Sequence, residues 1–246
     1  MIKKRSKVIR MNALAEILGT AIFVFLYFLF LQRNATEVLS KGFSVQLATS
    51  IGLSYFIGVY LPFYTYRIHI FPFVSIIEAL KRRDGKRLVQ KVFAQFIGSM
   101  LAVFCFLFFF YQSDVNTKLA DSVYDESHTW VGFLNQMLFV VIVSLFYYYM
   151  RFYSKAHHAY GHILMSIVIG VLLFQGASWS MLSASNSFGM LLMSVTGHLA
   201  VFKGDLLNVI VIHVAGPIVG IALAWGIIVM LGSNKKKKQI NKRSHA

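Results

Sequence analysis

The amino-acid sequence predicts an all-α membrane protein with six transmembrane helices and two re-entrant half-helices in an inverted repeat. Its composition is the first reason: 57% of the 246 residues are hydrophobic and only 13% are charged, and the mean hydropathy is +0.65. A soluble globular domain carries about 25% charged residues, so this chain lacks the side chains to cover a water-exposed surface. The composition excludes a soluble enzyme, and the 23 Phe, 12 Tyr and 3 Trp exclude a disordered chain.

Six apolar segments are long enough to cross a bilayer, which takes about 20 residues of helix. They cover residues 12–32, 43–66, 88–111, 129–152, 160–181 and 206–232. The first segment is not a signal peptide, because its apolar core is too long and no small-residue cleavage site follows it. An even number of spans places both termini on the same side of the membrane.

Lysine and arginine residues are strongly biased toward one side of this arrangement. Twenty of them lie in the N-terminus, the second and fourth loops and the C-terminal tail, and only four lie on the other side. The positive-inside rule therefore makes both termini cytoplasmic. The net charge of +15 is explained by this orientation and by contact of the basic termini with anionic lipids, so no nucleic acid partner is expected.

Two further apolar segments are too short to span. Residues 69–80 follow the second span, and residues 181–196 follow the fifth. Short apolar segments at matching places in two halves indicate re-entrant half-helices, expected at 72–82 and 184–196; a surface amphipathic helix is the alternative for each. The chain then divides into a basic N-terminus (1–11), a first repeat (12–111), an acidic extracellular loop (112–128), a second repeat (129–232) and a polybasic tail (233–246).

Several short motifs resemble those of a known family. They are AEILGT at 15–20, HIFPFVS at 69–75, the pair Gln95 and Gly98, and the pair Pro217 and Gly220. With the six spans and the two half-helices, these motifs are similar to the major intrinsic protein family, the aquaporins and glycerol facilitators, over residues 12–232. The resemblance implies an aquaporin-like fold, a homotetramer, and passive conduction of a small neutral solute. The single cysteine and the short loops indicate a plasma membrane.

The resemblance also implies which residues form the pore. The two signature loops at the pore centre comprise His69, Phe71, Pro72 and Phe73 in the first half and Ser183, Ala184 and Ser185 in the second. The family's spacing gives an outer selectivity filter of Ile51, Val171, Ser180 and Asn186. Glu16 is the buried acid that supports a re-entrant loop, and its fourth-span counterpart is replaced by Asn135 or Gln136.

Both Asn-Pro-Ala motifs of the family are degraded in this sequence, and a filter arginine is replaced by Asn186. A phenyl ring at Phe71 neither caps a helix nor donates to a solute, so we expect an unusually apolar centre. Phe71 acts there as a plug or dewetting gate, or it turns aside into the bundle core. Pro72 suits the first position of a helix, and Ser183 is able to cap the second half-helix.

These features predict a passive channel for a small neutral solute, glycerol-like or other, with water as a further candidate. The alternative is a non-conducting scaffold or partner-binding membrane subunit with the same fold. An enzyme is not expected, because no cluster of His, Asp, Glu or Cys lies in the spans. No cofactor or metal is expected, since His158 and His162 have a zinc-compatible spacing but no Cys or carboxylate joins them.

Overall fold

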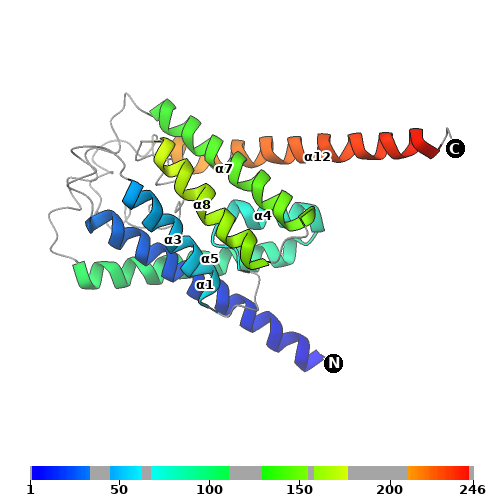
Figure 1. The fold of residues 1–246 in the computed structure, drawn as a ribbon. Helices are drawn as coiled ribbons and strands as arrows, with labels where there is room; N and C mark the ends of the chain where they lie inside the picture. Colours follow the sequence, from blue (N-terminus) through cyan, green and yellow to red (C-terminus); the bar gives the residue numbers. More distant parts are fainter. Residues whose placement is uncertain are drawn as a thin grey trace.

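The computed structural model describes residues 2–33, 45–62, 68–110, 129–154, 158–176 and 210–243, and these ranges contain helices and no strand. The helices are α1 (Ile2–Arg33), α3 (Val45–Tyr60), α4 (Pro72–Arg82), α5 (Gly85–Phe110), α7 (Thr129–Phe152), α8 (His158–Gly176), the π-helical turn η3 (Val211–Ala215) and α12 (Gly216–Arg243). Figure 1 shows one bundle, with both chain ends and the α4–α5 turn extending from the same end.

Each of the six expected spans overlaps an apolar helix among the described residues. Three are long and apolar enough to cross a membrane, namely Met11–Phe30, Gly85–Phe109 and Trp130–Phe152. The shorter apolar helices are Val45–Tyr60, Tyr160–Leu172 and Gly216–Gly232. The helix α12 continues beyond its apolar part into the basic tail.

The short helix α4 begins at Pro72, whose fixed φ and missing N–H suit the first helical turn. Phe71 is extended before it, and its carbonyl accepts the N–H groups of Val74 and Ser75 at 3.1 and 3.3 Å. The helix ends at Arg82, and the capping residue Arg83 that follows it adopts a left-handed conformation with φ of 56°. Its eleven residues extend about 16 Å, roughly half of a 30 Å hydrocarbon core. Re-entry of α4 into a membrane stays a prediction, and the expected second half-helix, 184–196, lies outside the described residues.

Glycines bring the helices of each half into close contact in the same way. A Cβ on Gly98 of α5 would lie 2.5 Å from the carbonyl oxygen of Ile17 on α1, and one on Gly220 of α12 would lie 2.8 Å from that of Met137 on α7. In each pair the backbones approach directly, which is how apolar helices pack tightly without a hydrophobic driving force. The pairing α1 with α5 is therefore repeated as α7 with α12.

This repetition decides which residue takes the place of Glu16 in the second half. Because Ile17 corresponds to Met137, Glu16 corresponds to Gln136 and not to Asn135. Glu16 is 1% exposed and Gln136 is fully buried, so both side chains face the interior. The second half thus carries a neutral amide where the first carries a carboxylate.

A π-helical turn precedes α12 and has a local cause. Pro217 has no N–H to offer the carbonyl four residues earlier, and its ring crowds that carbonyl. The chain instead makes a wider turn over Val211–Ala215, in which the Gly216 N–H donates to the Val211 carbonyl. The apolar helix resumes at Gly216 and brings Gly220 against α7.

Candidate pore centre and the polar cluster beside it

Phe71 lies in a cluster of five aromatic rings at the start of α4. Its ring stacks on Tyr55 of α3, with centroids 5.4 Å apart and planes 11° apart, and on Phe73, at 5.1 Å and 7°. Phe23 of α1 and Phe139 of α7 present their edges to it at 5.6 and 6.2 Å. Phe71 is 2% exposed, and the other four rings are 5% exposed or less. Aromatic side chains from both halves of the bundle therefore close around Phe71.

The remaining residues expected at the pore centre divide into two groups. Pro72 and Phe73 open α4 within or beside the ring cluster. The second signature loop, Ser183 to Ser185 with Ala184 between them, lies outside the described residues, as do the filter positions Ser180 and Asn186.

Glu16 anchors the segment that precedes α4. Both of its carboxylate oxygens accept the backbone N–H of His69 at 3.0 Å. The amide of Gln95, on α5, donates to Glu16 at 3.4 Å and also to the carbonyl oxygen of His69. Lys91, one turn earlier on α5, places its ammonium 3.3 Å from the same carboxylate. The backbone of His69 is thus held between α1 and α5, two residues before Phe71.

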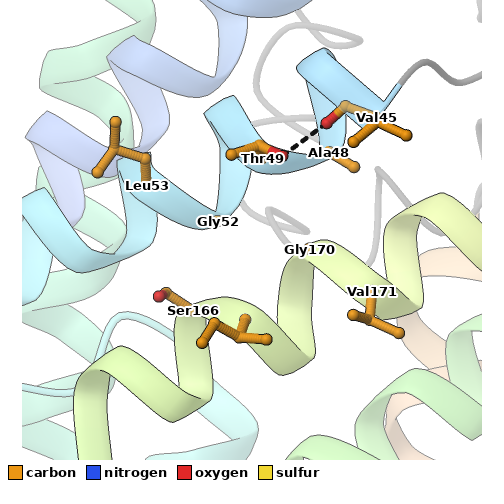
Figure 2. A pocket seen from close by; sticks show the side chains of 9 residues that line it. Val45, Ala48, Thr49, Gly52, Leu53, Ser166, Gly170 and Val171 are labelled. Atoms are coloured by element: carbon orange, nitrogen blue, oxygen red, sulfur yellow. Dashed lines mark hydrogen bonds between the residues drawn. The ribbon is translucent and has the colours of Figure 1, made fainter. Parts of the chain in front are cut away.

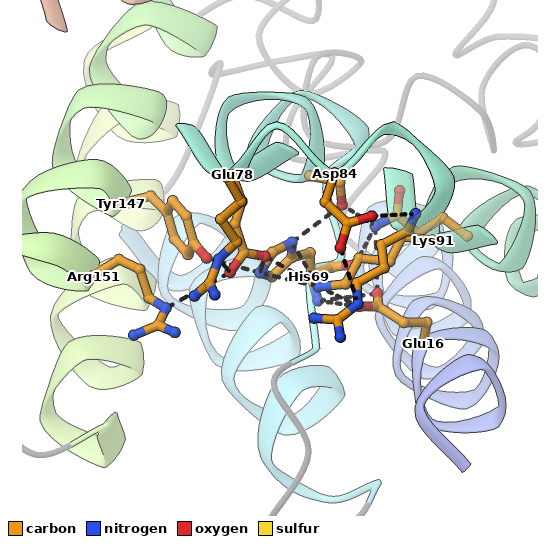
Figure 3. A network of polar contacts seen from close by, with 11 residues as sticks. Glu16, His69, Glu78, Asp84, Lys91, Tyr147 and Arg151 are labelled. Atoms are coloured by element: carbon orange, nitrogen blue, oxygen red, sulfur yellow. Dashed lines mark hydrogen bonds and ion pairs between the residues drawn. The ribbon is translucent and has the colours of Figure 1, made fainter. Parts of the chain in front are cut away.

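The imidazole of His69 is 4% exposed and lies at the centre of a polar cluster (Figure 3). Its Nε2 is 2.8 Å from the Tyr147 hydroxyl on α7 and 3.1 Å from a Glu78 carboxylate oxygen on α4. Its Nδ1 is 3.2 Å from the Ser75 hydroxyl and 3.1 Å from the Lys91 ammonium. Side chains from α4, α5 and α7 therefore converge on one ring.

Glu78 is a second buried acid, 8% exposed, in this cluster. Three cations lie around its carboxylate: Arg82 at 2.9 Å, Lys91 at 3.4 Å and Arg151 at 3.9 Å. Buried charges are tolerated when they are paired in this way. The cluster therefore carries three cations against the two carboxylates of Glu16 and Glu78.

The sequence prediction included Glu16 and His69 but missed Glu78, Lys91, Tyr147 and Arg151. A usable signal was the four-residue spacing of polar side chains on otherwise apolar helices, as in Glu78–Arg82, Lys91–Gln95 and Tyr147–Arg151. Residues spaced in this way share one helix face. Their convergence on His69 depends on how four helices pack, which no single segment encodes.

The two filter positions that the structure describes, Ile51 and Val171, differ in burial. Ile51 is fully buried, whereas Val171 is 53% exposed. Where α3 and α8 cross, a Cβ on Gly52 would lie 2.6 Å from the Ser166 carbonyl oxygen, and one on Gly170 would lie 3.2 Å from that of Ala48.

This crossing has its own internal symmetry, in which Gly52 corresponds to Gly170. Ile51 then corresponds to Ile169, which is also fully buried, and not to Val171. The dipeptide Ile-Gly occurs at both places in the sequence, but it also occurs at 57–58 and 97–98, so the sequence alone does not single out this pairing.

Val171 instead lines an outward-facing groove of about 490 Å³ between α3 and α8 (Figure 2). Its other lining residues are Val45, Ala48, Thr49, Gly52, Leu53, Ser166, Ile167 and Gly170. The hydroxyls of Thr49 and Ser166 donate to carbonyl oxygens of their own helices, each at 2.7 Å. The groove therefore offers an apolar surface to its surroundings.

Among the described residues, no group of three or more His, Cys, Asp or Glu side chains is arranged to hold a metal ion. The polar cluster is rich in cations and its two carboxylates are engaged by them. The hydrogen bonds and ion pairs of the cluster hold neighbouring helices together and balance the buried charges.

Comparison with known proteins shows the class of fold. No family model and no curated protein matches the sequence. In fold, the chain is similar to the X-ray structure of the aquaglyceroporin from Plasmodium falciparum, with a TM-score of 0.66 and 17% identity over 88% of this chain and 94% of that chain. The protein therefore has an aquaporin-like fold of apolar membrane helices. At this level of identity the likeness concerns the fold.

Proposed function

We propose that this protein is a membrane channel that passes a small neutral solute, and that Phe71 closes it in the conformation described here. The observation that carries the proposal is the place of Phe71 in an aquaporin-like fold. It lies at the start of the half-length helix α4, stacked on Tyr55 and Phe73. Because Phe71 is buried among these rings, a rotation of its side chain would rearrange the aromatic cluster at the start of α4.

The chemistry of the centre favours a neutral, partly apolar solute. Phe71 contacts four aromatic rings, and moving a charge into such surroundings costs far more than moving a neutral hydroxyl compound. A glycerol-like molecule has an apolar carbon face for these rings and hydroxyls for backbone carbonyls. Water and other small neutral solutes remain within this class. The outer selectivity filter would consist of Ile51, Ser180, Asn186 and one residue of α8. That residue is Val171 or Ile169, which corresponds to Ile51 where α3 and α8 cross.

The surroundings of the channel follow from the fold and the charge distribution. We propose a plasma-membrane protein with cytoplasmic termini, because both ends and the basic α4–α5 turn lie at one end of the bundle (Figure 1). The basic termini would contact anionic lipids. A homotetramer is expected, and native mass spectrometry from mild detergent tests it: a protein that is only monomeric would contradict it.

The experiment compares wild type, Phe71→Asn and Phe106→Asn in proteoliposomes after osmotic shock with glycerol, urea or an impermeant solute. Phe106 is the matched control. It is buried like Phe71, with 1% of its surface exposed, but its ring packs on Phe25 and Phe28 and not on Phe71. Phe71→Asn should increase solute or water flux severalfold over wild type, and Phe106→Asn should not. Light scattering gives the rates, and gel filtration confirms that each variant is folded.

The aromatic cluster around Phe71 also favours a second function, that of a non-conducting scaffold. Five buried aromatic side chains in mutual contact also suit a permanently closed bundle that serves as a scaffold or partner-binding subunit. If folded wild type and folded Phe71→Asn both leave the vesicles as tight as empty ones, the scaffold is the better account. Flux through wild type excludes it, whereas flux through Phe71→Asn alone shows only that the Phe71 ring closes the path.

A further inference from the structure

The basic turn between α4 and α5, residues 81–87, carries more positive charge than the neighbouring acids neutralise. Five of its seven residues are Lys or Arg, and one is Asp. Arg82 pairs with Glu78 at 2.9 Å, and Arg87 pairs with Asp84 at 3.1 Å. Three cations of the basic turn lie outside these two pairs, namely Lys81, Arg83 and Lys86.

Arg83 and Lys86 are the two cations of the basic turn that are open to a ligand. Both are exposed, and neither pairs with a carboxylate among the residues that the structure describes. Arg83 also has φ of 56°, a left-handed conformation that glycine adopts at lower cost. An exposed, charged side chain kept in a strained backbone position favours a function for that side chain.

Aromatic side chains at the end of α7 indicate that the basic turn lies at the membrane surface. The Lys81 ammonium lies 5.5 Å from the centroid of the Tyr148 ring, and Tyr153, 44% exposed, packs beside Tyr148. Tyrosines are enriched where a membrane meets water. The part of α5 that is long and apolar enough to span, Gly85–Phe109, begins within the basic turn. We therefore expect its cations at the depth of the phosphates of one leaflet.

One face of α5 beyond the basic turn is apolar and exposed. Val89 and Phe93 are 69% and 63% exposed, and they follow Lys86 at spacings that place all three side chains on one helix face. The helix rises about 10 Å from Lys86 to Phe93, which keeps Phe93 within the nearer half of a hydrocarbon core about 30 Å thick. A cationic group followed by an apolar strip matches a phospholipid better than a free anion.

We propose that the basic turn binds an anionic phospholipid, with the phosphate between Arg83 and Lys86 and an acyl chain along Val89 and Phe93. A guanidinium offers two N–H donors to two phosphate oxygens, and an ammonium adds a compact point charge. Clusters of Lys and Arg immediately beside a membrane helix bind anionic headgroups. This site is separate from the basic termini. It requires no conduction, so it stands whether the protein is a channel or a scaffold.

The test measures lipid binding to the full-length protein by native mass spectrometry from mild detergent. Phosphatidylglycerol and phosphatidylcholine with identical acyl chains are titrated, so the two lipids differ only in the headgroup. Glycerophosphoglycerol, the anionic headgroup without acyl chains, serves as the competitor. Wild type is compared with Arg83→Gln/Lys86→Gln, which removes both open charges but keeps a side chain at each position. The matched control is Lys237→Gln/Lys238→Gln, which removes two charges from the polybasic tail.

Wild type should bind its first phosphatidylglycerol about tenfold more tightly than phosphatidylcholine, because two unpaired cations face the phosphate. Arg83→Gln/Lys86→Gln should lose most of this preference, and Lys237→Gln/Lys238→Gln should keep it. Arg83→Gly should also bind phosphatidylglycerol more weakly than wild type, although glycine relieves the left-handed conformation at the end of α4. An equal concentration of glycerophosphoglycerol should displace little of the lipid, because it gains nothing from the apolar face of α5.

A wild-type preference in Arg83→Gln/Lys86→Gln, or an equal loss in the tail variant, overturns the proposal, because diffuse charge then holds the lipid. Full displacement by glycerophosphoglycerol also overturns it, because the site is then one for a soluble phosphate ester. Equal binding of the two lipids by wild type does the same. Gel filtration shows whether each variant is folded. If the double variant is not, Lys86→Gln, on the exposed first turn of α5, is judged by the same criteria.

Discussion

Both carboxylate oxygens of Glu16 lie 3.0 Å from the backbone nitrogen of His69, 53 residues further along the chain. A side chain of the first helix thus satisfies an amide in the segment that leads into α4. The carboxylate is fully desolvated, and its charge is balanced by Lys91 at 3.3 Å. Stability of the first half and the position of Phe71 consequently depend on the same few polar contacts.

Replacing Glu16 with Gln should destabilise the protein more than an ordinary core substitution. Lys91 would lose one of its two carboxylates, and removing one partner of a buried ion pair costs about 3–5 kcal/mol. Because Lys91 keeps Glu78 and is 21% exposed, we expect the lower end, about 3 kcal/mol. Unfolding in SDS–detergent mixtures measures it. In a double-mutant cycle with Lys91→Met, a coupling energy near zero would contradict the pairing.

Gly220→Ala should destabilise the bundle, whereas Gly226→Ala on the same helix should not. A methyl on Gly220 would meet the Met137 carbonyl oxygen at 2.8 Å, and none of the described atoms lies within 4 Å of a methyl on Gly226. Overpacking costs about 1–3 kcal/mol, while Gly to Ala in an open helical position gains up to about 1 kcal/mol. Thermal unfolding in detergent compares the two; equal shifts would argue against the close contact of α7 and α12.

Arg83→Gly should stabilise the end of α4. Arg83 has φ of 56°, and the Asp84 N–H donates to the Ala79 carbonyl at 3.2 Å across this turn. A side chain in the left-handed region costs about 1–2 kcal/mol, which glycine does not pay. We expect a gain of about 1 kcal/mol in the free energy of unfolding. Arg83→Ala removes the charge but keeps the Cβ, so a gain of the same size in that variant would show that charge and not conformation is responsible.

Ile169→Ser should alter solute flux, and Val171→Ser should leave it unchanged. Ile169 is fully buried and corresponds to Ile51 at the crossing of α3 and α8, whereas Val171 is 53% exposed on the outer groove. A hydroxyl in a buried apolar wall changes the solutes it accepts, while one on the outer surface does not. The Phe71→Asn background supplies a measurable rate. The reverse order of effects would favour Val171 over Ile169 as the filter residue.

The sequence was informative wherever a property resides in one segment. Apolar length predicted the helices, and Pro72 predicted where the half-length helix begins, because proline has a local preference for that position. The aquaporin-like fold itself was predicted correctly from spans and motifs. The sequence was less informative about which residues correspond or meet. Asn135 and Gln136 were equally good counterparts of Glu16 by sequence, and the packing of Gly220 on Met137 identified Gln136.

The sequence alone established the class of molecule: a chain with 57% hydrophobic and 13% charged residues, arranged in apolar segments of about 20 residues, predicts helices that satisfy their own backbone inside a membrane. The tertiary structure alone decided which side chains meet. Phe71 could face open space or other rings, and the approach of α3 and α7 placed Tyr55 and Phe139 against it. Lys91 could face solvent, and the packing of α1 and α4 on α5 directed it to His69. Hydropathy is a property of each residue, whereas contact between residues far apart in the chain exists only once the helices have packed.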